Sequence, residues 1–174
     1  GDWYKRQGLD GAIAIEDLTA GELQMGAIGG PVQLGYDSGR LDLTAQLALS
    51  GPALGERTLN DLIGEQATLT FDLAADLDAG RYQLTGSRLL GAHILIDADG
   101  VYGPGSERLA LNARATLDDL ALLTDRASGP VSADISTTGS NEIELVIDGS
   151  GIVTDARLAS LIEALSVTAT LRLE

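Results

Sequence analysis

Few residues in this sequence have the chemistry of a catalytic or metal-binding site. His93 is the single histidine, and the chain has no cysteine. A nucleophilic triad or a histidine metal site needs partners at defined positions, and the sequence places none beside His93. We therefore expect His93 to be a structural or solvent-facing residue on a strand.

The stretch DADG at 97–100 has the residue types that begin a calcium-binding loop. Such a loop needs further oxygen ligands and a distal Glu at fixed spacing, whereas Val101, Tyr102 and Gly103 follow here. A hairpin turn that requires positive φ uses the same residue types. The sequence thus predicts a turn at 97–100 and no metal site.

Carboxylate pairs are the remaining candidates for acid–base chemistry. They are Asp76 with Asp78, Asp118 with Asp119, and Glu142 with Glu144. Catalysis by such a pair needs a cleft that separates the two pKa values, but alternation places most of these side chains on wet strand faces. Phosphate-binding glycine loops, G-x-S-x-G and H-E-x-x-H are absent from the sequence. We predict a protein that is not an enzyme, with no catalytic residues, no cofactor and no metal.

Composition indicates an aliphatic, acidic, single-domain chain. Of 174 residues 44% are hydrophobic, yet there is only one Phe, one Trp and four Tyr. The net charge of −15 argues against nucleic acid and against a basic patch on an anionic membrane. No apolar run reaches the length of about 18 residues that a membrane-spanning helix needs. The start GDWYKRQG has neither an initiator Met nor a signal core, so we expect a segment, 1–174, of a longer protein.

Strict alternation of apolar and polar residues is the strongest signal in the chain. In ATLTFDLAADLDAG (67–80) the odd positions are apolar and most even positions are polar, which is typical of a strand with one dry face. The same pattern predicts strands at 41–49, 67–77, 109–117, 131–137, 143–147 and 167–173. The inward residues predicted to line the dry face include Leu41, Leu43, Leu47, Leu69, Phe71, Leu73, Leu77, Leu109, Leu111, Ala113, Leu117, Leu171 and Leu173.

Turns and short helical turns separate these strands. Turn residues occur near 37, 78, 97, 137 and 148. Helical spacing occurs at 58–65, with Thr58 as the expected N-cap, at 117–126, and at 154–165. A helical turn followed by a long strand therefore recurs three times at uneven intervals.

A sheet with one dry face must cover that face by closing, stacking or curling. A barrel, β-sandwich or β-solenoid would have a filled core, as in a structural or adhesion module. A curled sheet would instead leave an open trough. A polysaccharide-active β-solenoid enzyme is a third alternative, which the scarcity of aromatic residues disfavours.

Three segments resemble the TamB family, the inner-membrane-anchored subunits of the bacterial translocation and assembly module, and the related AsmA-like proteins. They are DLALLTDRASGPVSADISTTG, LNDLIGEQATLTFDLAADL and RYQLTGSRLLGAHILIDADG, and the resemblance covers residues 10 to 174. It implies an all-β fold: a long, curled, antiparallel-type sheet that forms a taco-like trough with a hydrophobic interior, plus short helical turns.

The resemblance also implies a role between the two membranes of the cell envelope. Such a periplasmic segment would shield phospholipid acyl chains or unfolded outer-membrane protein strands. An inner-membrane anchor and an outer-membrane assembly barrel partner would involve parts of the protein outside this segment. Because the predicted lining residues carry no hydroxyl, amide or charge, we expect no head-group recognition, and free sheet edges predict end-to-end self-association.

Overall fold

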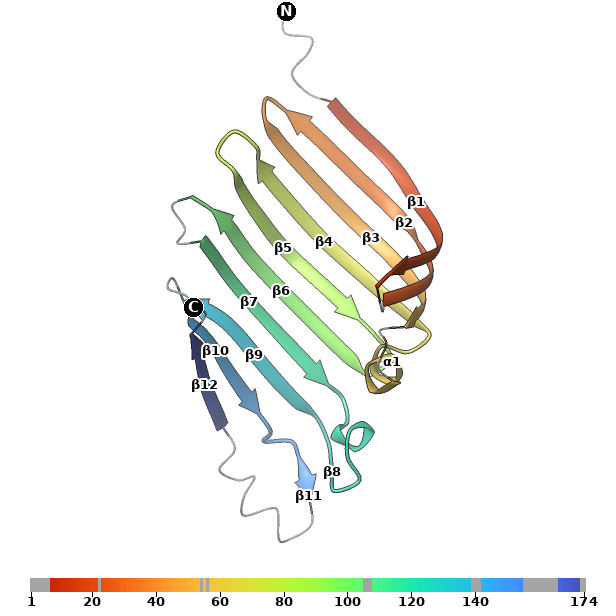
Figure 1. Ribbon diagram of the computed structural model, residues 1–174, viewed down its shortest axis with the longest axis vertical. Helices are drawn as coiled ribbons and strands as arrows, with labels where there is room; N and C mark the ends of the chain where they lie inside the picture. Colours follow the sequence, from red (N-terminus) through yellow and green to blue (C-terminus); the bar gives the residue numbers. More distant parts are fainter. Residues whose placement is uncertain are drawn as a thin grey trace, which may run out of the picture.

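The computed structural model describes residues 7–21, 23–53, 55, 57–104, 108–138, 142–154 and 166–172. They form one antiparallel sheet of ten strands in the order β1-β2-β3-β4-β5-β6-β7-β9-β10-β12 (Figure 1). The strands are β1 (Gln7–Ala20), β2 (Leu23–Asp37), β3 (Arg40–Ala53), β4 (Gln66–Asp76), β5 (Arg81–Leu90), β6 (Ile94–Gly103), β7 (Arg108–Leu117), β9 (Val131–Thr138), β10 (Glu142–Asp148) and β12 (Ser166–Arg172). The two-residue strands β8 (Ala127–Ser128) and β11 (Val153–Thr154) pair separately.

The two ends of the strands differ in their connections. At one end, which we call the hairpin edge, short turns join β2 to β3 and β4 to β5. At the other end, the helical edge, α1 (Arg57–Ile63) joins β3 to β4, and the 3₁₀ helix η1 (Leu120–Leu122) follows β7 (Figure 1). Backbone hydrogen bonds link these elements, from Ala92 N–H to Ile63 O at 2.8 Å and from Asp118 N–H to His93 O at 3.1 Å.

Alternation in the sequence becomes two distinct faces of the sheet. In the register of β3 with β4, Leu43 lies opposite Leu73, and Leu47 lies opposite Leu69. Their polar neighbours meet on the other face, where the Thr44 hydroxyl donates to Asp72 at 2.6 Å. Because side chains alternate along a strand, this register places the odd-numbered residues of β3 and β4 on one face. These are the residues that the sequence predicted to point inward.

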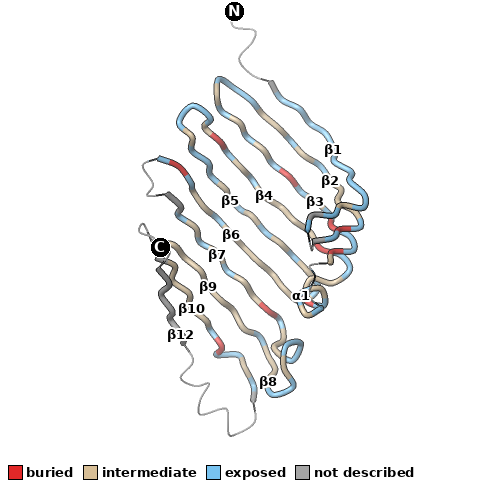
Figure 2. Tube along the Cα trace, in the orientation of Figure 1, coloured by how far each residue is buried: buried red, intermediate tan, exposed pale blue. Residues whose placement is uncertain are grey.

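The apolar face is not covered by a second layer within the described residues. The sheet is not closed, since β1 and β12 form its two edges without pairing to each other. Only seven hydrophobic residues of the described set are buried, and the chain trace is coloured mainly as intermediate or exposed (Figure 2). The prediction of an all-β, curled, antiparallel sheet is confirmed, and the described strands neither close into a barrel nor form a second large sheet.

The sheet curls at the helical edge because three neighbouring strands break their alternation at one level. Asp17 has φ of 53°, Gly51 has φ of 59°, and Gly26 lies between them in register. Beyond this level the inward residues change from odd to even numbers in β1 and β3, and from even to odd numbers in β2. Leu18 and Met25 therefore point inward. The resulting buried cluster, Met25, Leu49 and Ala67, is packed against Leu18 and against Ile63 of α1, among others.

Two local predictions are wrong. Residues 97–100 form the middle of β6 and not a turn, because Asp97 forms an ion pair with Arg88 and the backbone N–H of Gly86 donates to Asp99. Asp97 and Asp99 are polar because they lie on the outward face of β6, and in the sequence these residue types look the same as those of a turn. His93 lies in the loop before β6 and not on a strand; its side chain is 43% exposed, as predicted.

Two of the three helical predictions were right in place and inexact in detail. α1 begins at Arg57, so Thr58 lies inside the helix and is not its N-cap. The second helical stretch is a single 3₁₀ turn capped by Asp119, and Leu117 ends β7 instead of starting a helix. The third stretch lies outside the described residues except for its first residue, Thr154, which belongs to β11. The predicted turn near 137 lies in part outside the described residues, and β9 continues to Thr138.

Candidate functional site

The inward face of the sheet forms a continuous apolar surface, which we call the apolar trough. One row of partners crosses it through Leu34, Leu43, Leu73, Leu84, Gly100 and Leu111. A second row, nearer the helical edge, passes through Leu47, Leu69, Leu89, Ile96, Ala115, Ala133 and Ile147. Between them, the two rows place apolar side chains on the inward face of every large-sheet strand from β2 to β10, with Gly100 as a gap in the first row.

Side chains in the trough are half-buried by one another, and the α1 end is the better covered. Leu43, Leu73 and Leu111 are of intermediate exposure, whereas Leu49 is 8% exposed beside α1. At the free edge, Leu9 of β1 is 64% exposed. The trough is thus open along its length and more enclosed at the helical edge.

The predicted lining residues divide into three groups. Those on the inward face within strands are Leu41, Leu43, Leu47, Leu69, Phe71, Leu73, Leu111, Ala113 and Leu117. Leu77 lies past the end of β4, in the turn, and is 49% exposed. Leu109 and Leu171 pair within β7 and β12, but their side chains are outside the described set, as is the whole of Leu173.

Sequence reasoning missed the contributions of β1, β2, β5 and β6. Strand β5 contains a bulge between Leu84 and Ser87 that shifts its pairing with β6. Inward residues are even-numbered before the bulge, as at Tyr82 and Leu84, and odd-numbered after it, as at Leu89. The bulge hides the alternation, and its only local signal is Gly86, whose φ is 58°.

On the outward face, charged residues pair with each other across strands. Arg88 donates from Nε to Asp97 at 2.6 Å, and Arg114 donates from Nε to Asp134 at 2.6 Å. These hydrogen bonds lower the pKa of both carboxyl groups. Since all four side chains are well exposed, the pairs order a wet surface and do not form a reactive cleft.

No described group of acidic or histidine side chains has the arrangement of a metal or catalytic centre. His93 Nδ1 lies 3.1 Å from Asp118, and this pair joins the loop before β6 to the residue that follows β7. The carboxylate of Asp119 accepts from the backbone N–H groups of Ala121 and Gly129, which lowers its pKa. Within the described ranges there is no cluster of three or more potential metal ligands.

Fold and trough together define a class: in the residues that the structure describes, a single-layer, curled β-sheet whose apolar face has no second layer over it. Comparison with known proteins adds no family, since no family model, curated protein or solved structure matches this chain. None of the helices in the described part of the chain is long and apolar enough to cross a membrane.

Proposed function

We propose that this chain is a segment of a TamB-like envelope protein whose apolar trough shields phospholipid acyl chains in the periplasm, between the inner and outer membranes. The observation that carries the proposal is the apolar face of the sheet, which runs across strands β2 to β10 and which no other described element covers. A soluble protein rarely exposes a contiguous apolar surface of this extent unless the surface binds something.

The energetics of acyl transfer suit such a surface. Each methylene is about 0.8 kcal/mol more stable in an apolar environment than in water, so a chain of roughly 16 carbons meets a barrier of about 12 kcal/mol. A continuous aliphatic trough removes most of this barrier. It need only match the bilayer, because a carrier that bound acyl chains much more tightly would not release them.

The outward face is consistent with the same role. The chain carries a net charge of −15, and its outward side chains form cross-strand ion pairs such as Arg88 with Asp97. A charged exterior keeps copies of a protein apart in solution despite exposed apolar area. In the proposed arrangement, an inner-membrane anchor and an outer-membrane assembly barrel would be contributed or contacted by other parts of the full-length protein.

Unfolded outer-membrane protein strands are a second candidate cargo, favoured by the edge of the sheet. β1 pairs only with β2 among the described strands, so its other side presents free N–H and C=O groups. An extended peptide can add to such an edge by main-chain hydrogen bonds. Acyl chains remain the primary proposal because the two rows of inward residues from β2 to β10 are aliphatic and offer no hydrogen-bonding side chains to a peptide backbone.

Photo-crosslinking tests the proposal directly. Photoreactive residues at Leu43, Leu73 and Ala113 probe the trough, and matched residues next to them in sequence, Thr44, Asp72 and Arg114, probe the outward face. We expect phospholipid to be labelled from the first set alone when the protein is expressed in a bacterial envelope. Equal labelling from both sets, or no lipid in an extract of the purified protein, would contradict the proposal.

A further inference from the structure

The two long edges of the apolar trough are covered differently, and the helical edge is the closed one. Leu62 of α1 is 5% exposed, and Ile63 packs against the buried cluster that contains Leu49. The backbone N–H of Gly51 donates to Glu65 O at 2.8 Å, which ties the end of β3 to the segment after α1. Where β3 and β4 meet this edge, the apolar side chains of α1 therefore close the trough.

At the hairpin edge only short turns join β2 to β3 and β4 to β5 (Figure 1). The last row of inward residues before these turns contains three of the four tyrosines in the chain. The row, which we call the tyrosine row, runs strand by strand through Tyr36, Leu41, Ala75, Tyr82 and Tyr102. Tyr36, Tyr82 and Tyr102 are 43%, 39% and 55% exposed, so among the described residues no element covers this edge as α1 covers the other.

Tyrosine suits the boundary between an apolar trough and water. Its ring is apolar and its hydroxyl is polar, and it is enriched where acyl chains give way to lipid head groups. The rings of Tyr82 and Tyr102 are neighbours, with centroids 6.2 Å apart. No hydroxyl of the three tyrosines has a hydrogen-bond partner among the described residues, so each is available to water or to the polar part of a bound lipid.

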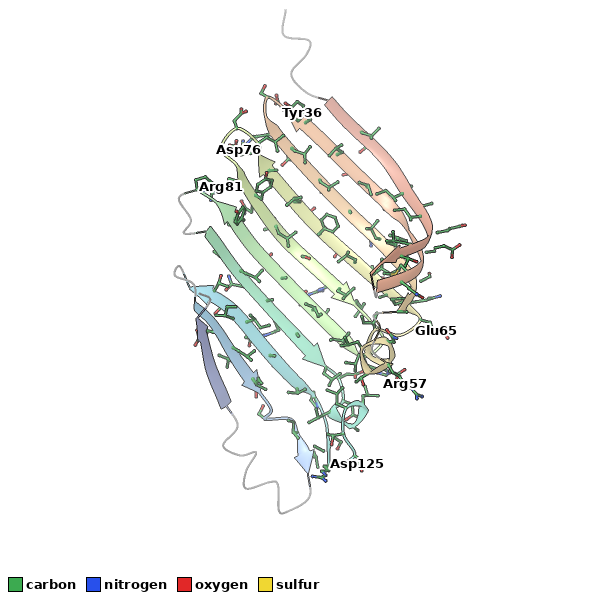
Figure 3. All side chains as sticks on the ribbon, viewed as in Figure 1. Tyr36, Arg57, Glu65, Asp76, Arg81 and Asp125 are labelled. Atoms are coloured by element: carbon green, nitrogen blue, oxygen red, sulfur yellow. The ribbon has the colours of Figure 1, made fainter. Side chains whose placement is uncertain are left out.

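The charged residues at the same level lie on the other face of the sheet. Arg40 pairs in register with Asp76, and Asp76 pairs with Arg81; the three line an outward hollow of about 380 Å³. Figure 3 shows Tyr36, Asp76 and Arg81 along this edge. The sheet separates these charges from the trough, so the tyrosine row itself carries rings and hydroxyls but no ionised group.

From this asymmetry we infer that the hairpin edge is the open lip of the trough, over which acyl chains enter and leave sideways. The tail of a lipid passes over the tyrosine rings toward the middle of the sheet, and its polar group stays in water beside the tyrosine row. The inference rests on the proposed function and adds to it a route of entry. Because the row holds no charge, the route accepts phospholipids with different head groups, in agreement with the expectation from the sequence.

The width of the trough is compatible with entry from one side. From Leu41 in the tyrosine row to Leu49 beside α1, eight strand residues at about 3.4 Å each span roughly 27 Å. An acyl chain in one bilayer leaflet spans about 15 Å, half of the hydrocarbon thickness. The end of an entering chain therefore lies between Phe71 and Leu69, and α1 need not move to admit it.

A bulky group attached at one edge or the other tests the route. The chain has no cysteine, so A79C, in the turn between β4 and β5, and A121C, in η1 at the helical edge, each offer one thiol for a maleimide-linked polyethylene glycol. Both alanines are exposed. Uptake of a fluorescent phosphatidylethanolamine from vesicles should slow roughly fivefold when the polymer is attached at A79C, because it occupies the approach to the lip.

The polymer at A121C is the matched control and should leave the rate of uptake unchanged. The amount of lipid bound at equilibrium should be the same in both variants, because neither position lines the trough. Equal slowing at both positions, or slowing at A121C alone, would overturn the route and leave the proposed function intact. A failure of the unaltered chain to take up any lipid would overturn both.

Substitution tests the part played by the tyrosine rings. Y82S/Y102S should weaken retention of phosphatidylethanolamine by roughly tenfold, because a bound chain loses the apolar surface of two rings. Gln83 and Val101 pair with each other on the outward face of the same two strands, so Q83S/V101S is the matched control and should retain lipid as before. In Y82F/Y102F the rings remain, and retention should stay close to that of the unaltered chain.

The same assay at high salt, with phosphatidylglycerol of equal chain length, tests the absence of head-group selection. The two lipids should be taken up by the unaltered chain within about threefold of each other, because no charged group lies in the tyrosine row to distinguish them. Equal losses in Y82S/Y102S and Q83S/V101S, or a strong preference for one head group, would overturn the inference.

Discussion

Replacing Leu49 with Ala tests whether the packing beside α1 anchors the sheet. Leu49 is 8% exposed and belongs to the buried cluster with Met25 and Ala67. Loss of a well-buried leucine costs between about 2 and 5 kcal/mol, depending on how well the site relaxes. Because the trough is open on one side of this cluster, we expect the lower part of that range, about 2–3 kcal/mol.

Two other leucines provide matched controls for L49A. Leu43 lies on the same strand and the same face but is only half-buried, so L43A should cost about 1 kcal/mol. Leu90 lies on the outward face and is 53% exposed, so L90A should stay within about 0.5 kcal/mol of the unaltered protein.

Urea unfolding and thermal melts followed by circular dichroism measure the order of the three variants. For a chain of this size, about 2–3 kcal/mol corresponds to a fall in Tm of roughly 5–10 °C. The expected order of destabilisation is L49A, then L43A, then L90A. If L43A were as destabilising as L49A, the assignment of the main buried cluster to the helical edge would be refuted.

Two further predictions concern the sheet edge and pH. The free side of β1 should promote concentration-dependent association, measured by sedimentation at high salt, where the charge of −15 is screened. I13K should reduce this association by placing a charge on the edge strand. A strict monomer at all concentrations would contradict a free edge. Arg88 and Arg114 lower the pKa of Asp97 and Asp134 below the usual value of about 3.9. The two ionised aspartates therefore stabilise the folded protein above about pH 4, and this stabilisation is lost as the pH falls through the lowered pKa values. D97N/D134N should therefore lose less stability than the unaltered protein between pH 5 and pH 2 in urea titrations, and equal losses would show that these pairs contribute nothing.

The sequence alone determined the parity of several strands. Side chains alternate between the two faces of any strand, so the pattern at 41–49 and 67–77 identified the inward residues before any partner strand was known. β3 and β4 confirm it, with Leu43 opposite Leu73 in the sheet. Short-range chemistry also located the turns after Asp37 and Asp76, where Gly39 and Gly80 adopt positive φ.

Strands with a break in their alternation could not be assigned from the sequence. β5 changes parity at its bulge, and β1, β2 and β3 change parity together at Asp17, Gly26 and Gly51. A bulge forms against a paired strand, so its position depends on the register with that strand and not on the alternation of the bulged strand alone. The inward position of Tyr82 is therefore a property of the assembled sheet.

Only the tertiary structure decided whether the apolar face is filled or open. Alternation requires that one face be apolar, but an identical pattern occurs in a sandwich, a barrel and a curled sheet. What covers the face depends on contacts between strands far apart in sequence, and here β1 and β12 remain separate edges. The same long-range register brings Tyr36, Tyr82 and Tyr102 into one row, because each successive hairpin ends at the same level of the sheet.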